Sequence, residues 1–313
     1  MSDIILLTYG EPPRAELRSQ FEYSRRILHG LTRLVAPIPR WIVPALAARR
    51  ALLRTVTWRA ERYGSPIEAL TREQARGLAA ALAALVPERL FRVHVAYEFR
   101  DPSLDDVLAQ VEEGALIVPM YLAESEFTHD LARRKLAERN GDGRGARVLP
   151  ALGAGVLARL SADWIEAELA RRGIAGGPDW ALVLAAHGTL VDPPRPMNTG
   201  REATEAVALA IADRLSGRFG AMTPAWLNHA MGGTWTSPAA DVALRGLADR
   251  GFRRIVYYPY GFVADNAESQ LEGRVLLRAE RRFEEVVHLP CLNAAPAYLD
   301  ALAGAILADL EAA

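Results

Sequence analysis

Cysteine is nearly absent from the sequence: Cys291 is the only one among 313 residues. One thiol cannot form a disulfide within the chain, and it cannot hold an iron–sulfur cluster, which takes several cysteine ligands. The count excludes a disulfide scaffold, and we expect no iron–sulfur cluster. It also favours a reducing compartment, and we expect the cytoplasm.

Charge of one sign and long hydrophobic runs are also lacking. The formal net charge is −1, so no overall positive field favours nucleic acid as a partner. No stretch approaches the roughly 18 uninterrupted apolar residues of a membrane span. The opening residues, MSDIILLTYG, have neither the basic region nor the apolar length of a secretory signal. We therefore expect a cytoplasmic protein without a nucleic acid partner.

Nucleotide-binding motifs are missing as well. Neither the Gly-x-Gly-x-x-Gly pattern nor the P-loop pattern follows a predicted strand, and there is no Gly-x-Ser-x-Gly elbow of the hydrolase type. The glycine-rich stretch RNGDGRG follows a helical pattern instead of a strand. These absences disfavour nucleotide chemistry.

What the chain does contain is an alternation of short apolar runs with helical patterns. Several runs are apolar almost throughout, which is typical of strands buried on both faces of a parallel sheet. The pattern occurs twice, with the segment 138–147 as a boundary, and predicts an α/β protein of two domains with a cleft between them. The predicted strands are 4–8, 91–97, 115–121, 181–185, 222–227 and 254–258.

Helix starts and ends are marked by capping residues. Thr71 with Gln74 three residues later predicts a capped helix over 71–86, and Ser103 with Asp106 predicts one over 103–113. Two further helices are predicted over 200–218 and 237–251, and Gly251 is a candidate C-cap for the second.

A histidine ends one of the buried strands, in the stretch LVLAAHGTLVDPP at residues 182–194. Open α/β sheets bind their ligands beyond the carboxyl ends of the strands, and histidine titrates near neutral pH. We therefore predict that His187 is a catalytic base, the alternative being a turn that happens to carry a histidine. His229 follows the next strand on the same loop face.

Three carboxylates follow the strand at 254–258. Asp265, Glu268 and Glu272 stand at i, i+3 and i+7, so a helix that starts near Asp265 would place them on one face. Carboxylate oxygens suit a divalent cation, so this row of carboxylates could pass such a cation along to a binding site. The alternative is a solvated stripe opposite Arg274 and Arg278.

Polar residues also follow the strand at 115–121. The stretch VPMYLAESEFTHD, residues 118–130, places Tyr121, Glu124, Glu126 and His129 beyond the strand end. They predict either a pocket wall or a polar loop that leads into a helix.

Residues 27–53 mix apolar side chains, three prolines and scattered arginines. One interpretation is a packed helix-loop-helix, because the prolines prevent one continuous helix. The other is an exposed apolar lip that lies over a hydrophobic pocket or contacts a membrane surface.

Five of these stretches together resemble the ferrochelatase family, which inserts ferrous iron into porphyrins. They occur in the family's order and cover nearly the whole chain, although each alone is a weak signal. The matching stretches are LLTYGEP (6–12), YGSPIEALTREQA (63–75), AYEFRDPSLDDVL (96–108), AAHG (185–188) and GFVADNAE (261–268).

The resemblance implies a fold of the class II chelatase type, with two Rossmann-like, doubly wound domains on four-stranded parallel sheets. Residues 1–150 would form the first domain and residues 151–294 the second, with the active cleft between them. The C-terminal helix, 295–313, would pack back on the first domain.

The resemblance also implies roles for single residues. His187 would accept a pyrrole proton or bind the metal, with Glu268 as its partner and Glu272 as a further metal ligand. No cofactor would be required, since Fe²⁺ is a substrate of this lyase reaction. The candidate porphyrin-binding residues are Tyr9, Trp41, Ser65, Tyr121 and Asn228, and Tyr9 stands where coproporphyrin-using enzymes have a tyrosine beside the metal.

The chain departs from the family pattern around the presumed pocket. Asn266 replaces a histidine, Glu98 replaces a basic residue, Leu227-Asn228 replaces a Gln-Ser pair, and AESEFTHD at 123–130 replaces a run rich in serine and threonine. These changes suggest a different tetrapyrrole, a different metal or a lost activity.

The hypothesis we favour is a chelatase of haem biosynthesis that inserts ferrous iron into coproporphyrin III, in preference to protoporphyrin IX. One alternative is a relative that acts on another tetrapyrrole or a non-porphyrin substrate and keeps a His187/Glu268 metal site. Another is a non-enzymatic haem- or porphyrin-binding protein. We expect a monomer or homodimer, with peripheral membrane contact through residues 27–53.

Overall fold

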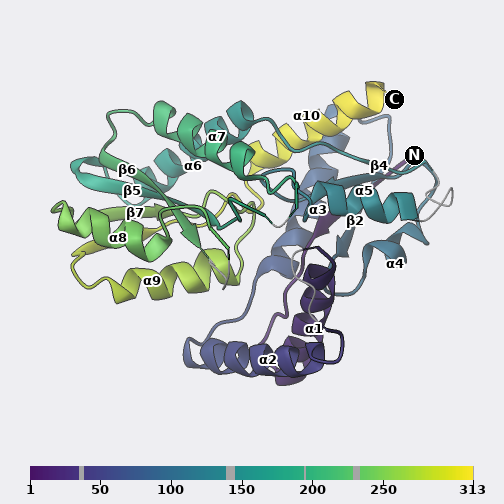
Figure 1. Ribbon diagram of the computed structural model, residues 1–313. Coiled ribbons are helices and arrows are strands. Elements are labelled where there is room, and N and C mark those ends of the chain that lie inside the picture. Colours follow the sequence, from purple (N-terminus) through teal and green to yellow (C-terminus); the bar gives the residue numbers. More distant parts are fainter. Residues whose placement is uncertain (35–38, 139–144, 194, 228–232, 313) are drawn as a thin grey trace.

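The protein is built on two parallel four-stranded sheets (Figure 1). The computed structural model describes residues 1–313 except 35–38, 139–144, 194, 228–232 and 313. The first sheet has the order β2-β1-β3-β4 and the second the order β6-β5-β7-β8, and all their pairings are parallel. The α/β fold with two parallel sheets is therefore confirmed. The strands are β1 (Ser2–Thr8), β2 (Phe91–Tyr97), β3 (Leu116–Pro119), β4 (Arg147–Val148), β5 (Gly177–His187), β6 (Phe219–Leu227), β7 (Arg254–Tyr258) and β8 (Glu285–His288).

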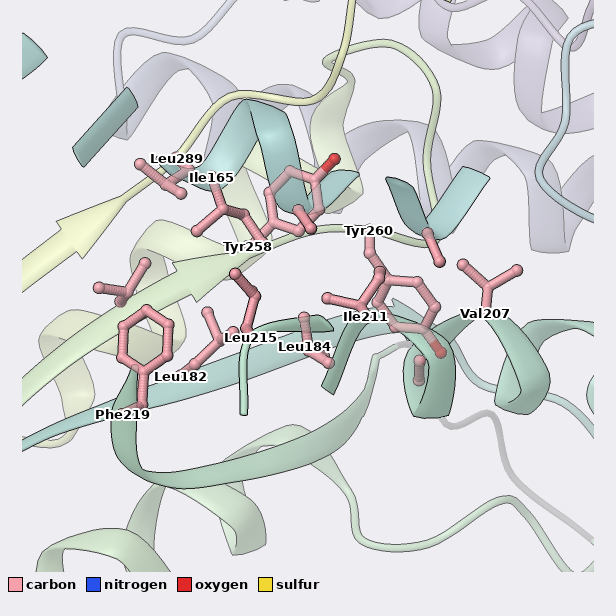
Figure 2. Close-up of a cluster of buried hydrophobic side chains, with 14 of the residues drawn as sticks. Ile165, Leu182, Leu184, Val207, Ile211, Leu215, Phe219, Tyr258, Tyr260 and Leu289 are labelled. Carbon is pink, nitrogen blue, oxygen red and sulfur yellow. The ribbon is translucent and has the colours of Figure 1, made fainter. Parts of the chain in front are cut away.

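The central strand of each sheet is apolar because both of its faces are buried. In β5, Leu182 and Leu184 belong to one core cluster, whereas Ala181, Val183 and Ala185 belong to a second cluster on the other face. Successive side chains of a strand point to opposite faces, so a continuous apolar run fills two cores at once. Figure 2 shows the first of these clusters, in which Leu182 and Leu184 lie among side chains of α6, α7 and β7. β1 divides its side chains between two clusters in the same way.

Helices cover both sheets. The first sheet is accompanied by α1 (Leu17–Leu34), α2 (Val43–Ala60), α3 (Ile67–Leu85), α4 (Leu104–Leu108) and α5 (His129–Glu138). The second is accompanied by α6 (Ala154–Arg171), α7 (Arg201–Arg214), α8 (Ala240–Asp249), the π-helix η1 (Ala267–Glu272) and α9 (Gly273–Ala279). The last helix is α10 (Pro296–Ala312).

Although α10 is last in the sequence, it lies against the first half of the protein (Figure 1). Leu299 and Leu302 of α10 share a buried cluster with Leu78 and Leu82 of α3 and with Leu6 of β1. The two helices approach closely, since a Cβ atom at Gly77 would lie 2.4 Å from the Leu299 side chain. Burial of each such leucine stabilises the fold by ~1.5–3 kcal/mol, so α10 is a structural part of the first half.

α1 and α2 form an arm that lies below both sheets in Figure 1. Arg54 of α2 donates to Gln20 of α1 at 3.0 Å, and its guanidinium lies over the rings of Tyr23 and Trp58. The structure thus forms two helices from the segment 27–53. Residues 35–38 of that segment lie outside the described residues.

The observed capping differs in part from the predicted capping. Ser103 and Asp106 form the expected capping box, although α4 ends at Leu108 instead of residue 113. Thr71 is not an N-cap, because α3 begins four residues earlier and Thr71 is bonded to the carbonyl of Ile67 inside the helix. Tertiary contacts of Ile67 extend α3 beyond its local signal. The edge strands β4 and β8 were not predicted: both residues of β4 are half-buried, and β8 has a single buried residue, Val287.

Candidate active site

The candidate site is centred on a histidine–carboxylate pair in the second half of the protein. His187 is the last residue of β5, and its Nδ1 lies 2.7 Å from Oε1 of Glu268. The His187 side chain is 51% exposed, whereas that of Glu268 is 15% exposed. The structure therefore brings the two predicted catalytic residues together, with the imidazole open to a ligand and the carboxylate behind it.

The carboxylate makes the imidazole more basic. Burial disfavours the charged ring, but the charge of Glu268 and its hydrogen bond outweigh that cost, and Glu272 adds to them, so the pKa of His187 is raised above its ordinary value. A hydrogen bond at Nδ1 also leaves Nε2 as the ring nitrogen available for chemistry. The pair therefore holds a proton up to a higher pH than a free imidazole would.

A glycine in the loop after β7 allows that loop to pack directly on β5. The amide of Gly261 donates to the carbonyl of Ala185 at 3.1 Å. A Cβ at Gly261 would lie 2.5 Å from the Cβ and 2.6 Å from the Cα of Ala186, the residue before His187. Only glycine fits this contact, and the loop that leads to Glu268 is fixed to the strand that carries His187.

Glu268 lies on the π-helix η1, which Asn266 caps. Asn266 is 1% exposed, and its Oδ1 accepts from the amides of Glu268 at 2.8 Å and Ser269 at 3.0 Å. Its Nδ2 donates to the carbonyl of Ala264. The residue that replaces the family's histidine thus fixes the start of the helix and does not face a substrate.

The predicted acidic stripe of three carboxylates is wrong in one member. Asp265 precedes the helix, and its Oδ1 accepts from Gln270 at 2.7 Å and from the amide of Cys291 at 2.8 Å. It therefore anchors the loop. Glu268 and Glu272 remain, four residues apart on a π-helix, whose turns are wider than those of the α-helix assumed for the stripe.

Glu272 is the second carboxylate near the pair. Burial, followed by the charge of Glu268, raises the pKa of Glu272 to about 7. In the parts of the chain that the structure describes, no group of three or more histidine, cysteine, aspartate or glutamate side chains is placed to hold a metal ion. Among the described residues, His187, Glu268 and Glu272 therefore do not form a ready three-ligand cage.

Tyr9 and Tyr121 lie where the two halves meet. Both line a cavity of about 30 Å³ together with Phe262 and Asn266 of the second half. That volume holds a water molecule or two, so it marks the contact between the halves and cannot accommodate a macrocycle. Burial, and then the charge of Glu11, raises the pKa of Tyr9 well above its ordinary value, so Tyr9 is a neutral phenol.

Glu98 lies at the end of β2 beside Tyr121. Its amide donates to the carbonyl of Thr8 at 2.9 Å, and its Oε1 is buried without a well-formed hydrogen bond to any described residue. Burial raises the pKa of Glu98 to about 7, although Lys135 and the Tyr121 hydroxyl oppose the rise. Near neutral pH this carboxyl is therefore often uncharged.

The stretch 118–130 contributes Tyr121 to the cavity, but its other polar residues are engaged elsewhere. Glu124 pairs with Arg133 at 2.8 Å, and Glu126 pairs with Arg134 and Arg195. His129 is fully buried, and burial lowers its pKa to about 4. These three side chains brace the loop and the start of α5.

The remaining predicted residues are scattered. Ser65 is 5% exposed, and its hydroxyl donates to Glu11 at 2.6 Å. Trp41 is 81% exposed just before α2. Asn228, like His229, lies outside the described residues.

Glu11 is a buried carboxylate that the sequence analysis did not identify. It is 3% exposed and lies two residues after Tyr9, within the stretch LLTYGEP. The available signal was a charged residue directly after a buried strand and a glycine. Such a residue must find partners to be buried, and here it finds Arg54 at 3.1 Å as well as Ser65.

Comparison with known sequences identifies relatives over the whole chain. The family model described as Ferrochelatase matches residues 2–310. The ferrochelatase of Synechococcus elongatus is 26% identical over 333 residues, an alignment that covers 98% of this chain and 82% of the relative.

Solved structures share the fold. CbiX, described as the terminal enzyme for biosynthesis of siroheme in denitrifying bacteria, has a TM-score of 0.55 and 22% identity, with 98% of both chains covered. SirB from Bacillus subtilis, solved with Fe³⁺, has a TM-score of 0.54 and 12% identity over 98% of this chain and 95% of that chain. These identities show the fold alone. The family model spans nearly the whole sequence, and the chain therefore belongs to the ferrochelatase family and is a metal chelatase.

Proposed function

We propose that this chelatase inserts ferrous iron into a porphyrin, with coproporphyrin III preferred over protoporphyrin IX. The observation that carries the proposal is the His187–Glu268 pair, with 2.7 Å between Nδ1 and Oε1 and an imidazole that is half exposed. Such a pair can accept a proton from a ligand that reaches the exposed edge of the ring.

The chemistry of metal insertion requires a base of this kind. As Fe²⁺ binds the four pyrrole nitrogens, two N–H bonds break and two protons leave. His187 takes one proton on its ring, and Glu268 stabilises the imidazolium that results. In this scheme Glu272, whose pKa is about 7, takes the second proton and passes it to solvent, and its carboxylate also meets the incoming cation. The metal is a substrate in this scheme, so no resident cofactor is required.

Two features, Tyr9 and Arg50, support the preference for coproporphyrin, which carries four carboxylates, and the state of Glu98 weakens an objection to it. Tyr9 is a neutral phenol near Glu268. Glu98 repels substrate carboxylates less than a permanent anion would, because its pKa is about 7. Arg50 of α2 is half-buried and has no ion pair with the residues that the structure describes, so its charge is available to a substrate carboxylate.

Absorption spectroscopy tests the activity. We expect the purified protein, given Fe²⁺ or Zn²⁺ under anaerobic conditions, to convert the Soret and Q bands of coproporphyrin III to those of the metalloporphyrin. Protoporphyrin IX and sirohydrochlorin are the comparison substrates. Conversion of sirohydrochlorin alone would favour the alternative of another tetrapyrrole. A bound porphyrin without conversion would favour a non-enzymatic binding protein.

Substrate preference has its own test in Glu98→Lys. The proposal expects a higher kcat/KM for coproporphyrin III than for protoporphyrin IX in the wild type at equal ionic strength. A wild type that prefers protoporphyrin IX, together with a variant that shifts toward coproporphyrin III, would refute the preference and identify Glu98 as the cause.

We further propose that the outer face of α2 contacts an anionic membrane surface from the cytoplasmic side. Leu52, Leu53 and Val56 are each more than half exposed on this face. α2 has no acidic residue, and its two exposed arginines, Arg49 and Arg59, suit anionic headgroups. No helix within the described residues combines the length and apolarity needed to cross a bilayer. Cosedimentation with vesicles that contain anionic lipid, but not with purely zwitterionic ones, would support the contact.

A further inference from the structure

Glu11 links three separate segments of the protein through one buried carboxylate. Its Oε1 accepts from the guanidinium of Arg54 at 3.1 Å, and its Oε2 accepts from the hydroxyl of Ser65 at 2.6 Å and the amide of Ala267 at 2.9 Å. Arg54 belongs to the α1–α2 arm, Ser65 to the loop before α3, and Ala267 to the start of η1. With 3% exposure, the carboxylate has these partners in place of water.

The contact with Ala267 completes the start of the helix that carries Glu268. The first four amides of a helix have no partner within the helix. In η1 these are the amides of Asn266 to Ser269: the Oδ1 of Asn266 accepts from Glu268 and Ser269, and the hydroxyl of Ser269 accepts from the amide of Asn266. Only the amide of Ala267 is left, and Glu11 is its acceptor.

The same interface has an apolar half. Trp58 of α2 forms a buried cluster with Ala267 and Leu271 of η1. The cluster brings η1 against the arm, but apolar contacts are not directional and leave the helix free to slide or rotate. The hydrogen bond from Ala267 to Glu11 is directional, and it acts one residue before Glu268.

We propose that Glu11 is a positioning residue that fixes the start of η1 and thereby holds Glu268 against Nδ1 of His187. It does not touch the reacting atoms, because both of its oxygens are bonded within the protein. This role rests on the proposed function, in which the His187–Glu268 pair accepts pyrrole protons. A small displacement of Glu268 would weaken the pair, and misplacement of about 1 Å can cost about a hundredfold in rate.

The test variant is Glu11→Asp, which keeps the charge but shortens the side chain so that it cannot reach all three partners. The direct readout is the titration of the His187 ring by NMR without substrate, with the signal assigned through His187→Asn. We expect the His187 pKa to fall toward 6.5, because the hydrogen bond from its Nδ1 to Glu268, which raises the pKa, is weakened. We expect kcat for metal insertion to fall about ten- to hundredfold, with the KM for porphyrin nearly unchanged.

Two further variants separate position from charge and from general destabilisation. Glu11→Gln keeps the length and loses the charge, so an effect of charge alone would lower the His187 pKa in E11Q but not in E11D. Glu68→Asp is the matched control, because Glu68 is also buried and pairs with an arginine, Arg100, at 2.8 Å. E68D should lower stability without moving the His187 titration.

The outcomes are distinct. An unchanged His187 pKa in E11D, or an equal fall in E68D, would overturn the positioning role. If E11D does not fold, Ser65→Ala replaces it, since it removes one donor to Glu11 and should lower the His187 pKa by a smaller step. No fall in S65A would then overturn the role. A lowered His187 pKa in E11D, combined with a wild type that inserts no metal, would refute the proposed function and leave the positioning role intact.

Discussion

The two halves of the protein have the same sheet topology but different residues at the same structural position. In each half the first strand of the sequence is second in the sheet, between the second and third strands. β1 is followed by the half-buried Tyr9 and by Glu11, whose carboxylate is 3% exposed and bonded within the protein. β5 ends with His187, whose side chain is half exposed.

This difference indicates that the two halves have different functions. The carboxyl end of the central strand in a parallel sheet is a place for chemistry in either half. The second half uses it for a histidine that can meet a substrate. In the first half this position carries Glu11, which binds the α1–α2 arm and η1. The first half therefore helps to position the reactive pair.

The strongest test of this difference is His187→Ala. Loss of a general base lowers turnover by about two to four orders of magnitude, so we expect a fall of that size in kcat for metal insertion. Porphyrin binding, followed by the Soret shift, should be retained. The matched control is His94→Ala in the first half. His94 of β2 is hydrogen-bonded to Asp3 of β1 at 2.8 Å. Wild-type turnover in H187A would remove His187 from the mechanism.

A second test disturbs the packing of the loop at Gly261 against β5, the strand that carries His187. Gly261→Ala places a Cβ 2.5 Å from Ala186, so the loop or β5 must shift. We expect a loss of ~1–3 kcal/mol in the free energy of unfolding, measured in urea, together with reduced turnover. Gly246→Ala is the control, because its Cβ would meet nothing within 4 Å in α8 and should stabilise the helix by up to ~1 kcal/mol. Equal stability of G261A and the wild type would show that the loop can move away from β5 without a cost in free energy.

The smallest expected effect on turnover is that of Glu272→Gln. The folded protein raises the pKa of Glu272 to about 7, from an ordinary value of 4.5. The proton on Glu272 therefore contributes stability that is fully present below pH 4.5 and is lost as pH rises through 7. Because glutamine does not ionise, E272Q should gain stability relative to the wild type at pH 8 but not at pH 4.

The same variant reports on the metal. If Glu272 meets the incoming cation, the KM for metal should rise more than the KM for porphyrin. A stability gain at pH 8 with an unchanged KM for metal would leave Glu272 as a group that only titrates. Thermal unfolding at the two pH values and initial rates across metal concentrations provide both measurements.

The central strands were predictable because a strand buried on both faces has apolar residues at nearly every position. The predicted 254–258 agrees with the central strand β7, and the predicted 91–97 agrees with β2, although β2 lies at a sheet edge. His187 could be placed at a strand end for the same reason. The edge strands β2 and β6 were predicted, but β4 and β8 were not, because they are only two and four residues long and depend on pairing with β3 and β7.

The site was harder to predict where it depends on tertiary contacts. Spacing placed Asp265, Glu268 and Glu272 on one face only if the helix was an α-helix that included all three. The bonds from Asp265 to Gln270 and Cys291 place it outside the helix. The role of Glu11 also could not be predicted, because its partner Ala267 is 256 residues away in the sequence.

The position of α10 has a consequence for how the chain folds during synthesis. The face of α3 that carries Leu78 and Leu82 is covered by α10, the last helix of the chain. A ribosome adding roughly 5–20 residues per second therefore exposes the apolar face of the first half for the whole time that the second half is made. The first half cannot complete its core on its own, and chains that stop before α10 present this face to chaperones, proteases and one another.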